Sequence, residues 1–220
     1  MLFRSLALIA VIVQPPVALE GLSSAAWISL FVKEAIIGVV IGLFFGLFLW
    51  AFEAAGVLVD MQIGASFALY FDPLVGNEVT PTGSLLGRWA SYLFVASGGL
   101  LLLAGSLVES FAIWPVERPA GEFSLATVRL FETEFSRFLS LTVRIAGPFM
   151  LALFVVDVAL GLVNRFAQQF NVFFLSMSVK AMASVLMLIV LLPYLATLLG
   201  EEIAAQPARV AAVLELLFGP

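Results

Sequence analysis

The 220-residue chain contains no histidine and no cysteine. Without cysteine there are no disulfides, thiol nucleophiles or thiolate metal sites, and without histidine there is no Ser–His catalysis and no His-ligated haem. The sequence also lacks a nucleotide-binding Gly-x-x-x-x-Gly-Lys-Ser/Thr run. We therefore expect no cofactor and no metal site, although carboxylate and lysine side chains remain capable of acid–base work.

Charge is scarce as well. Charged residues make up 11% of the chain, less than half of the roughly 25% found in soluble domains. The net charge is −5 and no basic run occurs, so nucleic acid is not an expected partner.

Hydrophobic residues, in contrast, reach 63%, and phenylalanine alone occurs 21 times. A soluble domain of this size could not bury so much apolar surface, and a disordered chain needs low hydrophobicity and high charge. We predict an all-α membrane protein, formed as a single membrane domain over residues 1–220.

Stretches without charge mark the candidate helices, which we place at about 2–19, 33–64, 85–113, 136–165 and 172–200. Two shorter amphipathic helices are expected at 125–137 and about 207–218. Residues 64–81 are expected to form a long loop. Long helical hairpins are the resulting architecture.

Seven residues of the 33–64 segment should share one helix face, because their spacings are three, four or seven. They are Gly38, Gly42, Gly46, Glu53, Gly56, Asp60 and Gly64. Glycines every four residues let helices approach closely, and a carboxylate facing lipid costs at least about 2.5–3.5 kcal/mol. We expect this face to meet protein or water. It is either a packing face with a polar seam or the lining of a water-filled conduit or proton path.

A second polar group lies nearer the C-terminus. Asp157 and Arg165 should share a helix face, and Lys180 lies on the next helix. Counted from Gln168 at the turn, Asp157 is 11 residues back and Lys180 is 12 forward, which places them at nearly the same height. An ion pair across the hairpin and separate snorkelling of each side chain are both open.

The loop after Gly64 is aromatic and apolar up to Asp72 and Pro73. Apolar loops are not left in water, so it is either buried against neighbouring helices or a re-entrant segment that plugs a cavity.

Three blocks in this order resemble the SctT/FliR family of type III secretion export-apparatus proteins. The first runs from Asp60-Met61-Gln62-Ile63-Gly64 through Phe71-Asp72-Pro73, the second from Pro148 to Gly161 and on through Asn164-Arg165 to Phe173, and the third is Leu175-Ser176-Met177-Ser178-Val179-Lys180. Gln168 and Ser178 depart from the family, which usually has proline there. The third block and Trp114-Pro115-Val116 favour the injectisome branch over the flagellar one. Relatives commonly have a further apolar segment or two before residue 2, so the chain is expected to start late.

The resemblance implies a non-enzymatic core subunit of a hetero-oligomeric export gate in the bacterial inner membrane. Its partners would be R-type and S-type subunits, a switch-type export component and the unfolded proteins that pass through. The implied plug residues are Phe67, Phe71, Asp72 and Pro73.

The residues leave an alternative of another class, a stand-alone ion-coupled secondary transporter. Its midplane site would consist of Glu53, Asp60, Asp157, Arg165 and Lys180. The absence of a visible inverted repeat and the small number of spans argue against it. A purely structural scaffold is a third reading.

Overall fold

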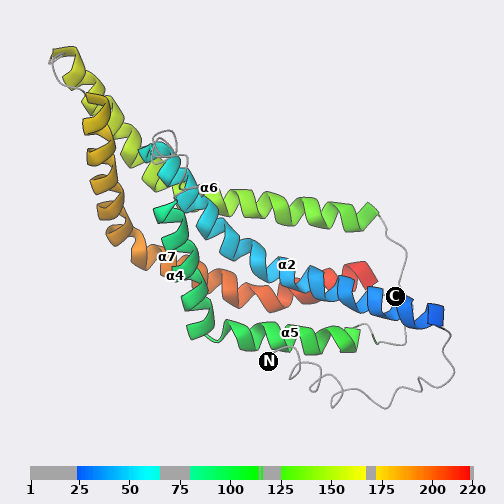
Figure 1. The fold of residues 1–220 in the computed structure, drawn as a ribbon. Coiled ribbons are helices and arrows are strands. Elements are labelled where there is room, and N and C mark those ends of the chain that lie inside the picture. Colours follow the sequence, from blue (N-terminus) through cyan, green and yellow to red (C-terminus); the bar gives the residue numbers. More distant parts are fainter. Residues whose placement is uncertain (1–23, 65–79, 114, 116–124, 167–171, 219–220) are drawn as a thin grey trace. The chain divides into compact units, whose positions relative to one another are not determined.

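The computed structural model describes residues 24–64, 80–113, 115, 125–166 and 172–218. They form five helices: α2 (Ser24–Ile63), α4 (Pro81–Ala96), α5 (Gly99–Ile113), α6 (Leu125–Phe166) and α7 (Val172–Phe218) (Figure 1). No strand occurs in these ranges, which confirms the predicted all-α class. The expected segment 2–19 and the plug candidates Phe67, Phe71, Asp72 and Pro73 lie outside the described residues.

The chain divides into two compact units. Unit 1 comprises residues 1–47, 94–136 and 201–220, and unit 2 comprises residues 48–93 and 137–200. Each unit has its own buried residues and its own polar contacts.

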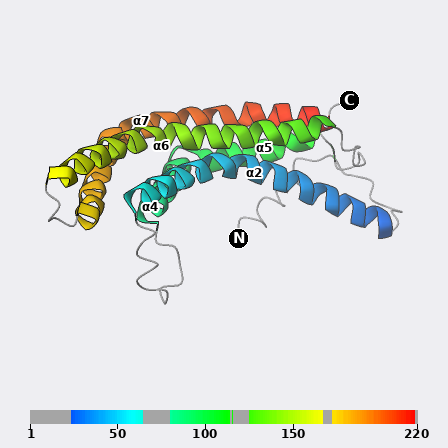
Figure 2. The same ribbon diagram turned by 90° about the horizontal axis from the view of Figure 1, so that it is seen from above.

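Unit 2 is organised around an antiparallel hairpin. Residues 137–166 of α6 and 172–200 of α7 run side by side (Figure 2). The end of α2 packs on this hairpin through a buried apolar cluster of Val59, Ile63, Phe149 and Leu153. Partly buried side chains of α7, among them Met187 and Leu191, cover the cluster. The aromatic pair Phe52–Trp89, with ring centroids 6.2 Å apart, adds a contact between α2 and α4.

Unit 1 buries one stripe of α2 and one of α7. The stripes follow helical spacing, as expected of core-facing positions. Their members are Ile37, Val40, Ile41, Phe44 and Phe45 on α2, with Ile203, Val210, Val213 and Leu214 on α7. Phe45 also meets Phe94 edge-on, at 6.1 Å between ring centroids.

Element boundaries differ from the sequence expectation at three places. The apolar segment 85–113 is two helices, because the chain turns at Gly98, whose φ of +84° is readily available only to glycine. The amphipathic pieces at 125–137 and 207–218 are not separate helices but parts of α6 and α7. No glycine or proline separates 125–137 from the residues after it, and α7 continues through Pro207 although a proline sacrifices one helical hydrogen bond.

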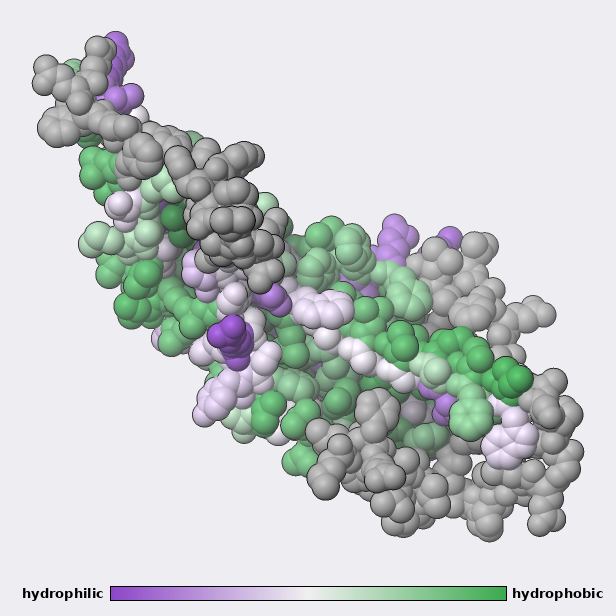
Figure 3. All heavy atoms as spheres, viewed as in Figure 1, coloured by the Kyte–Doolittle hydropathy of each residue, from purple (hydrophilic) through white to green (hydrophobic). Residues whose placement is uncertain are grey.

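Among the residues that the structure describes, three helices are long and apolar enough to cross a membrane, and α4 with α5 can count as a fourth span. The 40 residues of α2 extend over about 60 Å at 1.5 Å per residue, twice a hydrocarbon core of about 30 Å. Large apolar side chains are exposed on both units, for example Phe31 on unit 1 and Val143 and Val190 on unit 2. Apolar residues also predominate among the coloured atoms in Figure 3. That composition fits lipid or other apolar protein surfaces rather than water.

Candidate functional site

Asp60, near the end of α2, is the most deeply buried acidic side chain in the described part of the chain, with 2% of its surface exposed. Its carboxylate accepts hydrogen bonds from the backbone N–H groups of Thr82 and Gly83. The N–O distances to Oδ2 are 3.0 Å for both, and Thr82 N also lies 3.2 Å from Oδ1. A buried charge is thus matched by donors that would otherwise be left unpaired.

Those donors belong to the first turn of α4, where backbone N–H groups have no partner within the helix. Pro81, the first residue of α4, has no N–H to satisfy, so Thr82 and Gly83 present the first available donors. A negative charge here also interacts favourably with the helix dipole. Asp60 therefore caps α4 from a neighbouring helix rather than from the adjoining chain.

Glycine makes this capping possible, because α2 and α4 approach backbone to backbone. A Cβ atom added at Gly56 would lie 2.5 Å from Gly83 Cα and 2.6 Å from the Thr82 carbonyl oxygen. One turn further along α4, a Cβ at Gly87 would lie 3.2 Å from Glu53 Cβ. The small-residue face of α2 thus meets a second Gly-x-x-x-Gly pair at this end.

Lys180 provides the complementary cap at the end of α2. Its Nζ donates to the Gln62 carbonyl oxygen at 2.8 Å and lies 3.1 Å from Asp157 Oδ1. The Gln62 side chain closes the group by donating from Nε2 to Asp157 Oδ2 at 3.2 Å. Carbonyls in the last turn of a helix lack intrahelical donors, and a cation is favoured there. The helix then stops at Gly64, whose φ is +94°.

We call Asp60, Gln62, Asp157 and Lys180 the terminal anchor. A carboxylate holds the start of α4 and an ammonium holds the end of α2, so both ends of the connecting segment 65–79 are fixed by charged side chains. The ion pair across the α6–α7 hairpin, one of the two sequence readings for Asp157 and Lys180, is confirmed.

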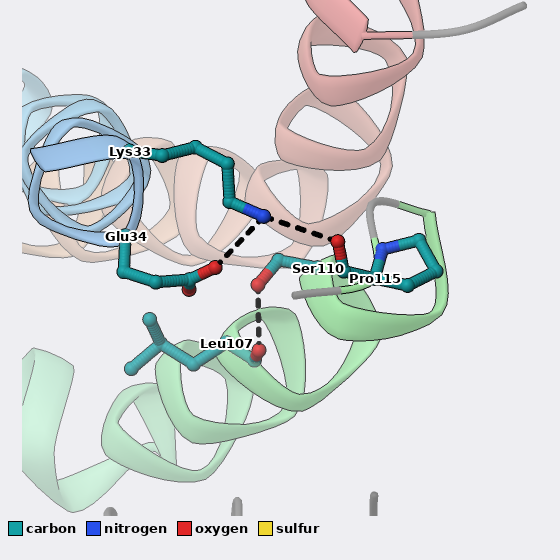
Figure 4. A network of polar contacts seen from close by, with 5 residues as sticks. All are labelled: Lys33, Glu34, Leu107, Ser110 and Pro115. Atoms are coloured by element: carbon teal, nitrogen blue, oxygen red, sulfur yellow. Dashed lines mark hydrogen bonds and ion pairs between the residues drawn. The ribbon is translucent and has the colours of Figure 1, made fainter. Parts of the chain in front are cut away.

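Unit 1 contains a second polar group, which we call the Lys33 network (Figure 4). Lys33 of α2 is 3% exposed, and its Nζ donates to the Pro115 carbonyl oxygen at 3.0 Å. It also pairs with Glu34 Oε1 at 3.1 Å. Ser110 of α5 donates to the Leu107 carbonyl at 2.7 Å beside this pair. The ammonium thus ties the chain just beyond α5 to α2.

Other residues singled out from the sequence do not join these groups. Glu53 and Arg165 are exposed, Gly46 is half-buried, and Gly38 and Gly42 are exposed with open space around an added Cβ atom. No set of three or more acidic residues that could hold a metal ion occurs in the described ranges.

Sequence reasoning missed Lys33, Thr82 and Gly83 as functional positions. A lysine at the edge of an apolar segment is usually expected to reach water, so the sequence carries no signal for the burial of Lys33. The Pro81-Thr82-Gly83 run with Gly87 four residues on carried a usable signal, since it combines a helix start with a small-residue face.

The family described as bacterial export proteins, family 1, matches residues 2–205. The chain is 35% identical to Yop proteins translocation protein T of Yersinia pestis over 158 residues, covering 72% of this chain and 60% of that protein. It is 32% identical to the secretion system apparatus protein SsaT of Salmonella typhimurium over 169 residues, covering 77% and 65%.

A flagellar relative matches at a similar level. The chain is 30% identical to the flagellar biosynthetic protein FliR of Bacillus subtilis over 159 residues, covering 72% of this chain and 61% of that protein. The chain spans about 60% of the length of the curated relatives it matches.

Proposed function

Because the chain belongs to family 1 of the bacterial export proteins, we propose that it is a core subunit of a type III secretion export gate. The resemblance to the SctT/FliR family is confirmed by that match and by relatives named for secretion and flagellar biosynthesis. The chain is a multi-pass protein of the bacterial inner membrane. Its role is to form, with R-type and S-type subunits and in contact with a switch-type export component, a non-enzymatic conduit for unfolded proteins.

The terminal anchor is the observation that carries this proposal. Asp60 and Gln62 come from the first block of the family resemblance, Asp157 from the second and Lys180 from the third. Residues of these blocks contact one another where α2 ends and α4 begins. The residues on which the family resemblance rests therefore hold both ends of segment 65–79. We propose that this segment is the plug of the conduit and that Phe67, Phe71, Asp72 and Pro73 form its seal.

Exposed glycines on α2 support assembly with other subunits. An added Cβ atom at Gly38 or Gly42 meets nothing within 4 Å. Small residues on an apolar helix allow close approach of another helix in a membrane. We propose that this part of α2 packs against a neighbouring subunit of the gate. The injectisome branch is favoured, because the translocation and secretion-apparatus relatives match at higher identity than the flagellar one.

Co-expression with the R-type and S-type proteins of the same locus tests the subunit assignment. We expect a stable hetero-oligomer by native mass spectrometry in mild detergent. Gly42→Leu should reduce its yield, whereas Gly105→Leu, at an exposed glycine of α5 with equally open space, should leave it unchanged. A monomer or homodimer that does not bind the R-type and S-type proteins would contradict the proposal.

Ion conductance of the assembled gate tests the seal. Bulky rings can close a narrow pore to ions and water. Phe67→Ala combined with Phe71→Ala should therefore raise the conductance, while Phe154→Ala, at an exposed position of α6, should not. Unchanged conductance in the double variant would refute the plug assignment.

A further inference from the structure

Arg144 of α6 and Tyr194 of α7 form an exposed polar pair on the unit 2 hairpin. Arg144 Nε donates to the Tyr194 hydroxyl oxygen at 3.1 Å. Both side chains are open to the surface, and the structure gives Arg144 no ion-pair partner within the described part of the chain. The positive charge is therefore held in place but is not neutralised.

The position of this charge along the helices is unusual. Arg144 is the only charged residue between Arg137 and Asp157, a stretch of about 30 Å at 1.5 Å per residue, which equals a hydrocarbon core of about 30 Å. Tyr194 lies in the uncharged stretch 181–200 of α7. Arg144 is seven residues, or roughly 10 Å, from the Arg137 end. A charge inside an apolar stretch long enough to cross a membrane is costly if it faces lipid.

The hydrogen bond leaves donors aimed outward. Because Nε donates to Tyr194, the two terminal nitrogens of the guanidinium keep four N–H groups in one plane. This geometry matches a carboxylate that binds in bidentate fashion. The Tyr194 oxygen accepts from Arg144, so its own proton is available as a further donor. The remaining donors of the pair therefore have a geometry that suits a carboxylate.

The surrounding surface suits an apolar helix. Gly147, one turn after Arg144, has open space around an added Cβ atom, which permits close backbone approach. Leu151, two turns after Arg144, is 69% exposed, and Val190, one turn before Tyr194, is 71% exposed. These side chains offer apolar contacts around a single charge.

We propose that the Arg144–Tyr194 pair binds an aspartate or glutamate on an apolar helix of another subunit of the export apparatus, an inference that rests on the proposed function. A partner carboxylate would neutralise the guanidinium inside the apolar region. A lipid phosphate fits less well, because phosphates lie outside the hydrocarbon core.

The test is native mass spectrometry of the full chain co-expressed with the other export-apparatus subunits of its locus. We expect Arg144→Glu to lower the fraction of assembled complex about tenfold or more, because removing one member of a desolvated charge pair is costly. Arg144→Lys should lose less, since an ammonium keeps the charge but not the planar fork, and Tyr194→Phe should lose least. Arg165→Glu, at an exposed arginine in the last turn of α6, is the matched control.

Charge exchange identifies the partner residue. In the Arg144→Glu background, replacing each intramembrane aspartate or glutamate of the co-purified subunits by arginine should restore assembly at one position only. Circular dichroism and thermal unfolding of the chain alone in detergent should show that Arg144→Glu leaves its fold intact.

Two results would overturn the site without affecting the proposed function. One is normal assembly of the Arg144→Glu complex. The other is a bound anionic phospholipid that Arg144→Gln removes while the subunit composition stays unchanged. If the unaltered chain does not assemble with these subunits at all, the proposed function and this site are both refuted.

Discussion

The terminal anchor in unit 2 and the Lys33 network in unit 1 use charge at helix ends in different ways. Lys33 holds one carbonyl beyond α5 and pairs with Glu34, its immediate neighbour in sequence. The terminal anchor joins residues separated by 22 to 118 positions and holds the start of one helix and the end of another. The Lys33 network holds the chain at one point, just beyond α5. The terminal anchor holds the helix ends on both sides of segment 65–79.

The difference shows what a buried charge does in a chain with so few charges. Helices that cross a membrane have little water around them, so backbone groups at their ends need partners from the protein. Where one end must be held, a lysine with a neighbouring glutamate is sufficient. Where two ends must be held together, side chains of both signs are drawn from three helices. The three predictions below test this comparison.

Asp60→Ala should produce the largest effect. It leaves the N–H groups of Thr82 and Gly83 buried without an acceptor, and hydrogen bonds to charged groups are worth about 1.5–3 kcal/mol each. We expect the free energy of unfolding in detergent to fall by at least about 3 kcal/mol. Glu53→Ala removes an exposed carboxylate from the same helix and should cost far less. Similar losses for the two variants would mean that Asp60 does not act as the cap of α4.

Gly56→Ala should have the next largest effect. Its Cβ atom would lie 2.5 Å from the Gly83 backbone, which cannot move aside as a flexible side chain could. We expect a loss of about 1–3 kcal/mol in thermal unfolding, typical of overpacking.

Gly42→Ala, on the same helix but in unit 1, is the matched comparison. Its Cβ atom meets open space, so the isolated chain should gain up to about 1 kcal/mol from better helix propensity. If both alanine variants shifted the unfolding temperature in the same direction, the two ends of the glycine face would not differ as described.

Lys33→Met should cost less than Asp60→Ala and about as much as Gly56→Ala. The substitution keeps the apolar stem but removes the donor to the Pro115 carbonyl and the partner of Glu34. We expect a loss of about 1–3 kcal/mol, the cost of leaving a buried polar group unpaired. Lys33→Met combined with Glu34→Gln should recover part of it. A double variant less stable than the single one would show that Glu34 does not depend on Lys33.

The ion pair between Asp157 and Lys180 could be predicted because a short hairpin fixes height by counting residues from its turn. The partners of Asp60 could not, because 20 residues separate it from Pro81 and no local periodicity relates their ends. Asp60 was recognised as an unusual carboxylate, but its acceptor role depends on the close approach of Gly56 and Gly83. That approach depends on how α2 and α4 pack in the tertiary structure, which the local sequence does not determine.

The helices likewise include features that the sequence predicts and boundaries that it does not. Long apolar stretches predicted the existence of the helices from hydropathy alone. The turn at Gly98 escaped prediction because a hydropathy window averages over a single glycine, although its positive φ ends α4 and begins α5. Pro207 was read as a helix start, yet α7 runs through it, since neighbouring helical bonds tolerate one missing donor.

Both ends of segment 65–79 are held by residues that lie outside it. The length of the segment should therefore have little effect on the stability of the fold. The bonds that hold Gln62 and Thr82 involve no side chain from the segment. In a loop closed in this way, doubling the number of residues adds only about 0.6 kcal/mol of closure entropy. If segment 65–79 is the plug proposed above, insertions and exchanges within it would alter what the gate admits at little cost to the stability of the surrounding helices.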